Sequence, residues 1–213
     1  MTQLPENTPR DASSAPPGPA GTRGALLILS GPSGVGKSTL VNELLRRMEA
    51  DLSVSMTTRP MTKGDVDGEH YYFVNVPTFE RAIKNGELLE HAVYAGNFYG
   101  TPRTYVEQKL AAGRTVIVEI DVEGARQVKQ SLPESFAIFI KAPTEEALIE
   151  RLRKRQREDE QTIQKRFAIA KKEIAFAEST DVYDAFVVND DFDRAVAEIE
   201  SRVAEHLTAG RGR

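Results

Sequence analysis

The 213-residue chain contains no cysteine and only three histidines. Without cysteine there is no disulfide framework and no thiolate metal site, and this composition is typical of a reducing compartment such as the cytoplasm. No two of the histidines stand at the spacing of paired metal ligands. The absences exclude disulfide-stabilised and Cys/His zinc-binding classes and favour a cytoplasmic protein.

Long hydrophobic runs and a strong net charge are also missing. The longest apolar runs are far shorter than the ~20 residues that a membrane helix needs, and no secretory signal is apparent. The formal net charge is −4, so we expect no general affinity for nucleic acid or for a membrane surface. With 40% hydrophobic and 28% charged residues, the composition is that of an ordinary globular domain.

The chain contains an alternation of strand and helix patterns, which begins only after a segment of different composition. Residues 1–23 are rich in Pro, Ser, Ala and Gly, which predicts a disordered tail, because such a segment buries too little apolar surface to offset ordering. From residue 24 the alternation predicts an α/β fold with a parallel sheet flanked by helices. The expected strands are 25–29, 115–121, 136–140 and 185–189, and the expected helices are 39–48, 122–130, 144–155, 162–179 and 193–206.

The stretch 53–104 interrupts this alternation with short strands and turns. We interpret it as a mixed α/β lobe inserted into a core that comprises residues 24–52 and 105–206, with a short tail at 207–213. The strands expected in the lobe are 53–56, 71–74 and 88–94, with a turn at Gly96-Asn97.

Residues 31–38 read GPSGVGKS, a complete GxxxxGK[ST] phosphate loop between an expected strand and an expected helix. Its glycines let consecutive backbone N–H groups point into one hollow at a helix N-terminus, where the dipole favours anions. Lys37 can then reach the β- and γ-phosphates, and the Ser38 hydroxyl can bind Mg²⁺. The sequence therefore predicts an ATP site, whose other loop residues are Gly31, Pro32, Ser33, Gly34, Val35 and Gly36.

Basic residues crowd the stretch 151–166 around an acidic middle. Such a run is usually the solvated face of a helix. Beside a phosphate loop, arginines of this kind can instead close over a triphosphate and neutralise a phosphoryl transition state. Both interpretations are open at this point.

Further motifs follow the phosphate loop in an order that resembles guanylate kinases. SMTTRP spans 55–60, GDVDGEHY spans 64–71, NGELLEH spans 85–91 and NFYGT spans 97–101. The resemblance runs from about residue 24 to 206 and includes a lid at about 144–166. It implies ATP-dependent phosphorylation of GMP, and of dGMP as well, to the diphosphate with Mg²⁺.

The resemblance also implies a role for individual residues. Glu90 would accept the two adjacent donors of guanine, N1–H and the 2-amine, as a fork. Adenine would present this carboxylate with an acceptor, a mismatch that can be worth ~10⁴-fold. The other implied GMP contacts are Asp121 at the amine, Ser55 and Thr101 near the base, and Arg59, Tyr71 and Tyr99 at the phosphate. The implied catalytic residues are Lys37, Arg59, Arg151, Arg155 and Arg166, while Asn189 lies against the adenine of ATP.

The chain departs from the family pattern at several informative positions, two of which concern the proposed phosphate and metal contacts. Thr62 stands where a second arginine is usual; Lys63 follows it and could supply the charge, although without the planar fork of a guanidinium. Glu119 ends its strand where Asp is usual, and the longer side chain could still reach Mg²⁺ through water. We assign four other aromatic residues of the lobe to the core: Tyr72, Phe73, Tyr94 and Phe98.

Two other classes of function are weighed against this one. A kinase for a sugar phosphate such as ribose 1,5-bisphosphate would keep the loop and the lid but would not need Glu90 and Asp121. A non-catalytic guanylate-kinase-like module that binds proteins would tend to lose the loop lysine, which is present as Lys37. We expect small-molecule substrates and a monomer or homo-oligomer, with no nucleic-acid or membrane partner.

Overall fold

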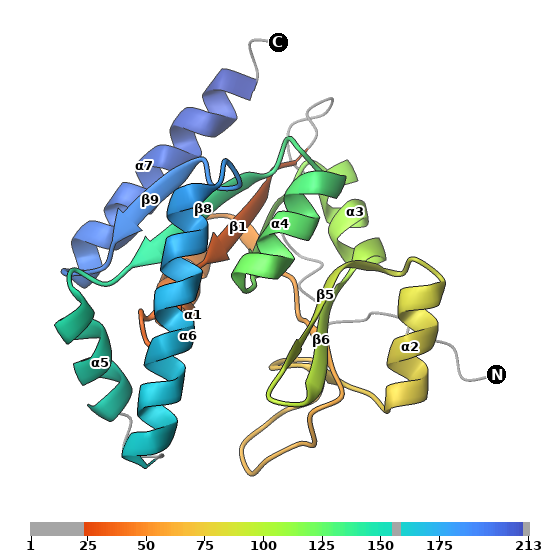
Figure 1. The fold of residues 1–213 in the computed structure, drawn as a ribbon. Coiled ribbons are helices and arrows are strands. Elements are labelled where there is room, and N and C mark those ends of the chain that lie inside the picture. The colour runs from red at the N-terminus through yellow and green to blue at the C-terminus, as the bar shows by residue number, and fades with distance from the viewer. Residues whose placement is uncertain (1–23, 155–158, 211–213) are drawn as a thin grey trace. The chain divides into compact units, whose positions relative to one another are not determined.

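The computed structural model describes residues 24–154 and 159–210 (Figure 1). The predicted N-terminal tail and Arg155 lie outside these ranges. The described residues divide into two compact units, which we call the first unit (24–26 and 51–118) and the second unit (27–50, 119–154 and 159–210).

The elements confirm the α/β class that the sequence predicts. They form a five-stranded sheet in the order β2-β7-β1-β8-β9 and a four-stranded sheet in the order β4-β3-β6-β5. In chain order they are β1 (Leu26–Ser30), α1 (Lys37–Arg47), β2 (Ala50–Leu52), β3 (Met56–Thr57), β4 (Tyr72–Phe73), α2 (Val76–Lys84), β5 (Leu88–Tyr94), β6 (Asn97–Pro102), α3 (Arg103–Ala111), β7 (Thr115–Glu119), α4 (Val122–Ser131), β8 (Phe136–Lys141), α5 (Glu145–Lys154), α6 (Glu160–Ser179), β9 (Ala185–Val188) and α7 (Phe192–Gly210).

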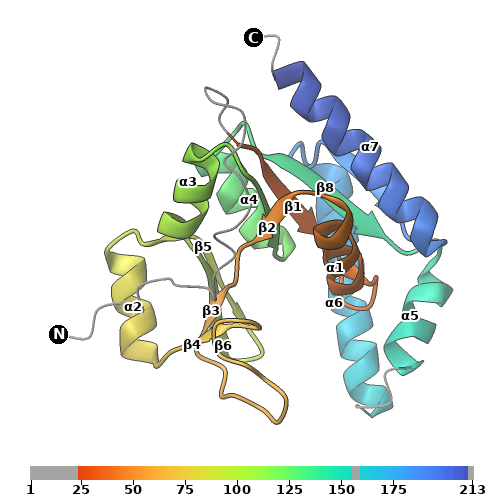
Figure 2. The same cartoon turned by 180° about the vertical axis from the view of Figure 1, so that it is seen from behind.

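The second unit is a parallel sheet with helices on both faces. β1 pairs in parallel with β8, and β8 pairs in parallel with β9. Figure 1 shows α4 and α6 in front of these strands, and Figure 2 shows α1 and α7 on the opposite face. Every residue of β1 is buried, because helices cover both faces of the sheet. This burial explains why the sequence of the strand is an almost continuous apolar run.

The first unit contains a four-stranded sheet with α2 packed on one face. Met56, Phe79, Ala82 and Leu88 form its core, and Phe98 stacks on Phe79 with ring centroids 5.3 Å apart. Asn75 caps α2 by accepting a hydrogen bond from the Thr78 N–H at 2.9 Å, which satisfies one of the exposed donors of the helix start.

The predicted elements differ from the observed ones at several places. Residues 53–55 are not a strand, and the turn of the β5–β6 hairpin is Ala95-Gly96, one residue earlier than predicted. The strand predicted at 115–121 ends at Glu119, because Asp121 caps α4 through the Gly124 N–H at 2.8 Å. The last helix continues to Gly210, through residues that the sequence assigns to a tail. Within the described ranges, no helix combines the length and apolar character needed to cross a membrane.

Candidate active site

The phosphate loop, residues 31–38, joins β1 to α1 in the second unit. Gly31 has a φ of 150°, and a Cβ there would lie 2.5 Å from the Ile140 carbonyl oxygen of β8. Gly36 caps α1 with a φ of 95°, and a Cβ there would lie 2.8 Å from the Asn189 side-chain nitrogen. Both positions therefore require glycine, for backbone conformation and for space.

The two polar residues that begin α1 are both engaged. Lys37 Nζ donates to the loop carbonyls of Gly31 at 2.6 Å and Pro32 at 3.2 Å, so the lysine folds back over the loop. Ser38 Oγ donates to the Glu119 carboxylate at 2.9 Å. A hydroxyl and a carboxylate at this position are hard oxygen ligands of the kind that Mg²⁺ prefers. Ser38 and Glu119 are therefore suitable ligands for Mg²⁺, although glutamate stands where aspartate is usual.

The residue predicted to contact adenine also supports the phosphate loop. Asn189 is buried after β9, and its side-chain N–H₂ donates to the Val35 carbonyl at 2.7 Å. Arg151 of α5 donates to the Asn189 carbonyl at 2.8 Å, and Arg166 of α6 donates to the Ser33 hydroxyl of the loop. Two of the predicted catalytic arginines are thus bonded to the loop or to a residue that supports it.

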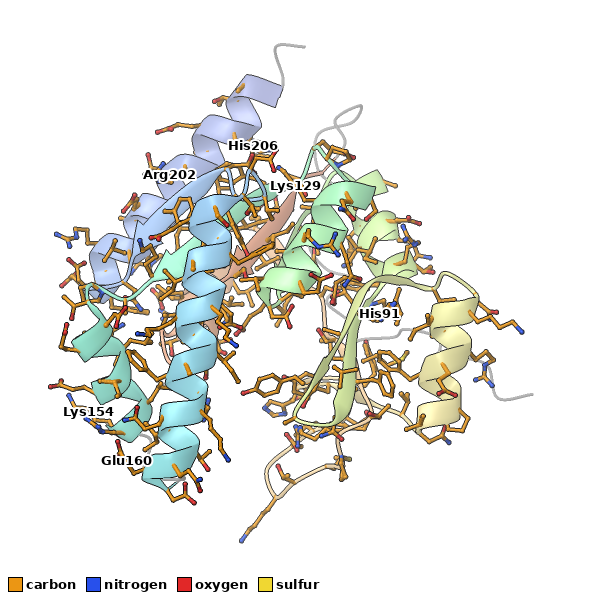
Figure 3. All side chains as sticks on the ribbon, in the orientation of Figure 1. His91, Lys129, Lys154, Glu160, Arg202 and His206 are labelled. Atoms are coloured by element: carbon orange, nitrogen blue, oxygen red, sulfur yellow. The ribbon has the colours of Figure 1, made fainter. Side chains whose placement is uncertain are left out.

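The basic residues of α5 and α6 fall into two groups, which differ in what they contact. Arg153 donates to Glu160 at 2.6 Å and both side chains are exposed, as on a solvated helix face. Figure 3 shows Lys154 and Glu160 at the same end of the α5–α6 pair, away from the strands. Arg151 and Arg166 instead reach Asn189 and the phosphate loop. Each of the two interpretations therefore applies to part of the run.

Glu173 of α6 is a half-buried carboxyl that the sequence analysis does not single out. Burial raises its pKa to about 7; the nearby charge of Lys37 works against this rise and that of Asp121 adds to it. The sequence contained an indication of this burial. Glu173 shares a helix face with the buried Ala170 and Ala177, and a charged residue on a buried face is unusual.

In the first unit, the polar candidates share the sheet face opposite α2. Strand residues alternate between faces, and Met56 and Phe98 pack toward α2. The register pairs Glu90 with Thr101 and Thr57 with Tyr99, which places these side chains on the other face. The Thr101 hydroxyl donates to Glu90 at 2.6 Å, and the two residues are only 1% and 5% exposed.

The three predicted phosphate-binding residues of the first unit lie together. The Arg59 guanidinium carbon is 5.4 Å from the centre of the Tyr71 ring, and the Tyr71 and Tyr99 rings meet edge to face at 5.7 Å. Thr57 fixes the backbone beside them, since its hydroxyl accepts from the Arg59 N–H at 3.1 Å. A guanidinium and two phenols are suitable donors for a phosphate.

Asp65 is the functional candidate in this cluster that sequence reasoning did not identify. It accepts two hydrogen bonds from Arg59, at 2.9 and 3.1 Å, and two from Thr62, from the backbone N–H at 2.6 Å and the hydroxyl at 2.8 Å. These bonds hold the pKa of Asp65 well below its usual range. The bonds from Arg59 have the largest effect, and those from Thr62 add to it. The signal was its place in GDVDG, which the sequence analysis used only as a family motif.

The remaining predicted residues have mixed outcomes. Ser55 precedes β3 and is half-buried. Asp121 belongs to the second unit, whereas the other GMP candidates belong to the first. The assignment of Tyr94 to the core is wrong, because its side chain is 47% exposed near the hairpin turn. Phe73 lies at Arg59, with its ring centre 5.3 Å from the guanidinium carbon, and Tyr72 and Phe98 pack on the core as predicted.

Comparisons with known proteins identify the family of the chain. A family model described as guanylate kinase matches residues 23–206. Proteins named guanylate kinase from Synechococcus sp. (strain JA-3-3Ab) and Synechocystis sp. (strain ATCC 27184 / PCC 6803 / Kazusa) are each 47% identical to the chain. The matches cover 87% of the chain and 84% of the first protein, and 89% of the chain and 98% of the second.

A solved structure is similar over the same region. The crystal structure of guanylate kinase from Anaplasma phagocytophilum matches with a TM-score of 0.71 and 34% identity, over 86% of each chain. Because the family model and these relatives cover most of its length, the chain belongs to the guanylate kinase family.

Proposed function

We propose that the chain transfers the γ-phosphoryl group of ATP to GMP, giving ADP and GDP. As a member of the guanylate kinase family it is a phosphotransferase, and the comparisons support neither the sugar-phosphate kinase nor the non-catalytic module. The observation that carries the choice of acceptor is the buried Glu90 carboxylate, bonded to Thr101 on the polar sheet face that also carries Tyr99.

Guanine recognition follows from the chemistry of Glu90. A carboxylate accepts the N1–H and 2-amine donors of guanine, and the Thr101 hydroxyl orients it for this purpose. Adenine offers an acceptor at the N1 position, so two acceptors would face each other where guanine supplies a donor, and this mismatch is costly. Ser55 and Asp121 are proposed as further contacts of the base, and dGMP is accepted because none of these contacts involves the 2′-hydroxyl.

The phosphates are bound by cations and backbone donors. We place the triphosphate of ATP on the phosphate loop and the GMP phosphate on Arg59, Tyr71 and Tyr99. Lys37 would leave its loop carbonyls to contact the migrating phosphoryl group, and Arg151, Arg155 and Arg166 would neutralise charge in the transition state. No general base is needed, because the attacking phosphate oxygen is already anionic at neutral pH.

Ser38 and Glu119 are the residues that would hold Mg²⁺, Glu119 through water. The ion would supply charge neutralisation at the β- and γ-phosphate oxygens, and Mg²⁺ commonly has few protein ligands because phosphates and water complete its shell. We further propose a cytoplasmic enzyme whose partners are small nucleotides, and a lobe and lid that close on them to exclude water.

The test is an ADP-release assay with GMP, dGMP, AMP, CMP, UMP and ribose 1,5-bisphosphate as acceptors. We expect turnover with GMP and dGMP alone. Glu90→Gln replaces one acceptor oxygen with a donor that faces the donors of guanine, so it should raise KM for GMP and leave KM for ATP unchanged. Thr78→Ala, which alters the distant α2, is the matched control. Turnover of the sugar phosphate, or equal changes in both KM values, would overturn the proposal.

A further inference from the structure

Arg59 has a neighbouring carboxylate that the proposed reaction does not use, and the bonds between them decide which edge of the guanidinium is available. We propose that Asp65 is a positioning residue that holds Arg59 by one edge and presents the other to the acceptor phosphate. This inference rests on the proposed function, since it takes Arg59 as the residue that binds the phosphate of GMP.

The hydrogen bonds of Arg59 are confined to the outer end of its guanidinium. Nη1 donates to Asp65 Oδ2 at 2.9 Å and to the Pro60 carbonyl at 3.0 Å, and Nη2 donates to Asp65 Oδ1 at 3.1 Å. A guanidinium has five N–H donors and can form a fork along either of two edges. Asp65 occupies the Nη1–Nη2 edge, so the Nε–H and the second Nη2–H form the edge directed to a phosphate.

Aromatic rings restrict the same group. The guanidinium carbon lies 5.4 Å from the centre of the Tyr71 ring and 5.3 Å from that of Phe73. Cation–π contacts of this kind favour a guanidinium placed against a ring face. The rings and the Asp65 fork together leave Arg59 little freedom to lose when the phosphate binds, which favours affinity.

Asp65 is itself fixed by Thr62, the residue that stands where a second arginine is usual. The Thr62 backbone and hydroxyl both donate to Asp65 Oδ2, and Gly64, with a φ of 100°, allows the intervening turn. Lys63 is exposed in this turn. We infer that Thr62 serves the phosphate clamp indirectly, by holding the carboxylate that orients Arg59.

The main test compares Asp65→Asn with the original chain in steady-state kinetics. Asparagine keeps the shape but loses the charge and turns one acceptor into a donor facing Nη, so Arg59 is no longer held as a fork. We expect KM for GMP to rise about ten-fold, with KM for ATP unchanged and kcat changed less. Asp65→Glu should recover part of the loss, which a merely structural role would not explain.

Two controls separate phosphate positioning from damage to the fold. Guanosine lacks the phosphate, so its affinity, measured by calorimetry, should be the same for Asp65→Asn and the original chain. Asp67→Asn changes another acid of the same loop, whose Oδ1 accepts from the Phe73 N–H at 2.9 Å, and it should leave KM for GMP unchanged. Thr62→Val, which removes only the supporting hydroxyl, should raise KM for GMP by a smaller factor.

Arg59→Lys distinguishes failure of this inference from failure of the proposed function. If this substitution leaves KM for GMP unchanged, the acceptor phosphate does not bind the guanidinium fork of Arg59, and the inference falls together with the Arg59 contact of the proposed function. If it raises KM while Asp65→Asn leaves it unchanged, positioning by Asp65 is overturned. A lower KM in Asp65→Asn would also overturn it, because Asp65 would then compete with the phosphate for Arg59. Adding Asp65→Asn to Arg59→Lys should have little further effect.

Discussion

Glu173 illustrates how one side chain can respond to the charges of the phosphate loop. Desolvation raises its pKa to about 7, and the charges that act on it are those of Lys37 and Asp121. A carboxyl that prefers its protonated form in the folded chain binds more protons there than in the unfolded chain. Between its ordinary pKa of 4.5 and about 7, the free energy of unfolding should therefore fall as the pH rises.

Glu173→Gln removes this ionisation and should make the chain more stable than the original at pH 8. Well below pH 4.5, where the glutamate is protonated in both states, the two should be nearly equal. Thermal unfolding of both proteins from pH 3 to pH 8 measures the difference. Glu80→Gln, an exposed position on α2, is the control and should show no such trend. A difference that is constant with pH would contradict the expectation.

At the scale of elements, a buried ion cluster joins β2, α3 and the start of β7 within the first unit. Asp51 accepts from Lys109 at 3.0 Å and from Arg114 at 2.9 Å. Burial works to raise the pKa of Asp51, but the hydrogen bonds from Arg114 and Lys109 outweigh it and the pKa is lowered. Removing one partner from such a cluster leaves buried charges uncompensated, which costs more than the loss of a surface pair.

Asp51→Asn should accordingly destabilise the chain by about 3 kcal/mol. Urea unfolding monitored by circular dichroism gives the value. Glu107→Gln is the matched control on α3, because it breaks an exposed pair with Arg103 at 3.4 Å and should cost less than about 1 kcal/mol. Equal losses in the two variants would show that Asp51 is no more than a surface charge.

Two of the elements that the sequence analysis missed, β6 and α2, were missed for different reasons. β6 reads NFYGTP, in which Gly100 and Pro102 reduce the strand signal, although the neighbouring Tyr99 and Thr101 carry candidate functions. Helix α2 follows Asn75, an N-cap, with proline in its first turn, a helix-start signal that could have been recognised. The long β1, β8 and α6 patterns were predicted to within a few residues, because burial on a regular face leaves a clear periodicity.

At the scale of the whole molecule, the units differ in their bounds from the predicted lobe. The sequence predicts a lobe at 53–104, whereas the first unit continues through α3 and most of β7 to residue 118. Arg103, at the start of α3, donates to the carbonyls of Gly86 at 3.0 Å and Leu88 at 3.2 Å. These bonds attach α3 to β5, a connection that the sequence pattern of α3 does not indicate.

Removal of residues 1–22 should leave kcat and the melting temperature within error, because a segment of this composition contributes no packed contacts. The comparison is a chain that lacks residues 1–28, which also loses the buried start of β1 and should fail to fold. Thermal scans and ADP-release rates measure both. A drop of several degrees for the shorter deletion would show that the tail binds to the folded chain.

The sequence by itself determined the α/β class, the phosphate loop and the family, because these depend on local periodicity and on residues at fixed spacing along the chain. It also placed Glu90 and Arg59 among the candidates through the resemblance. Tertiary structure decided which groups bond to them: Thr101 to Glu90, Asp65 to Arg59, and Asn189 to the loop at Val35. It also decided the burial of Glu173 near Lys37. Such pairings depend on strand register, loop conformation and helix packing, which bring side chains together irrespective of their spacing in the sequence.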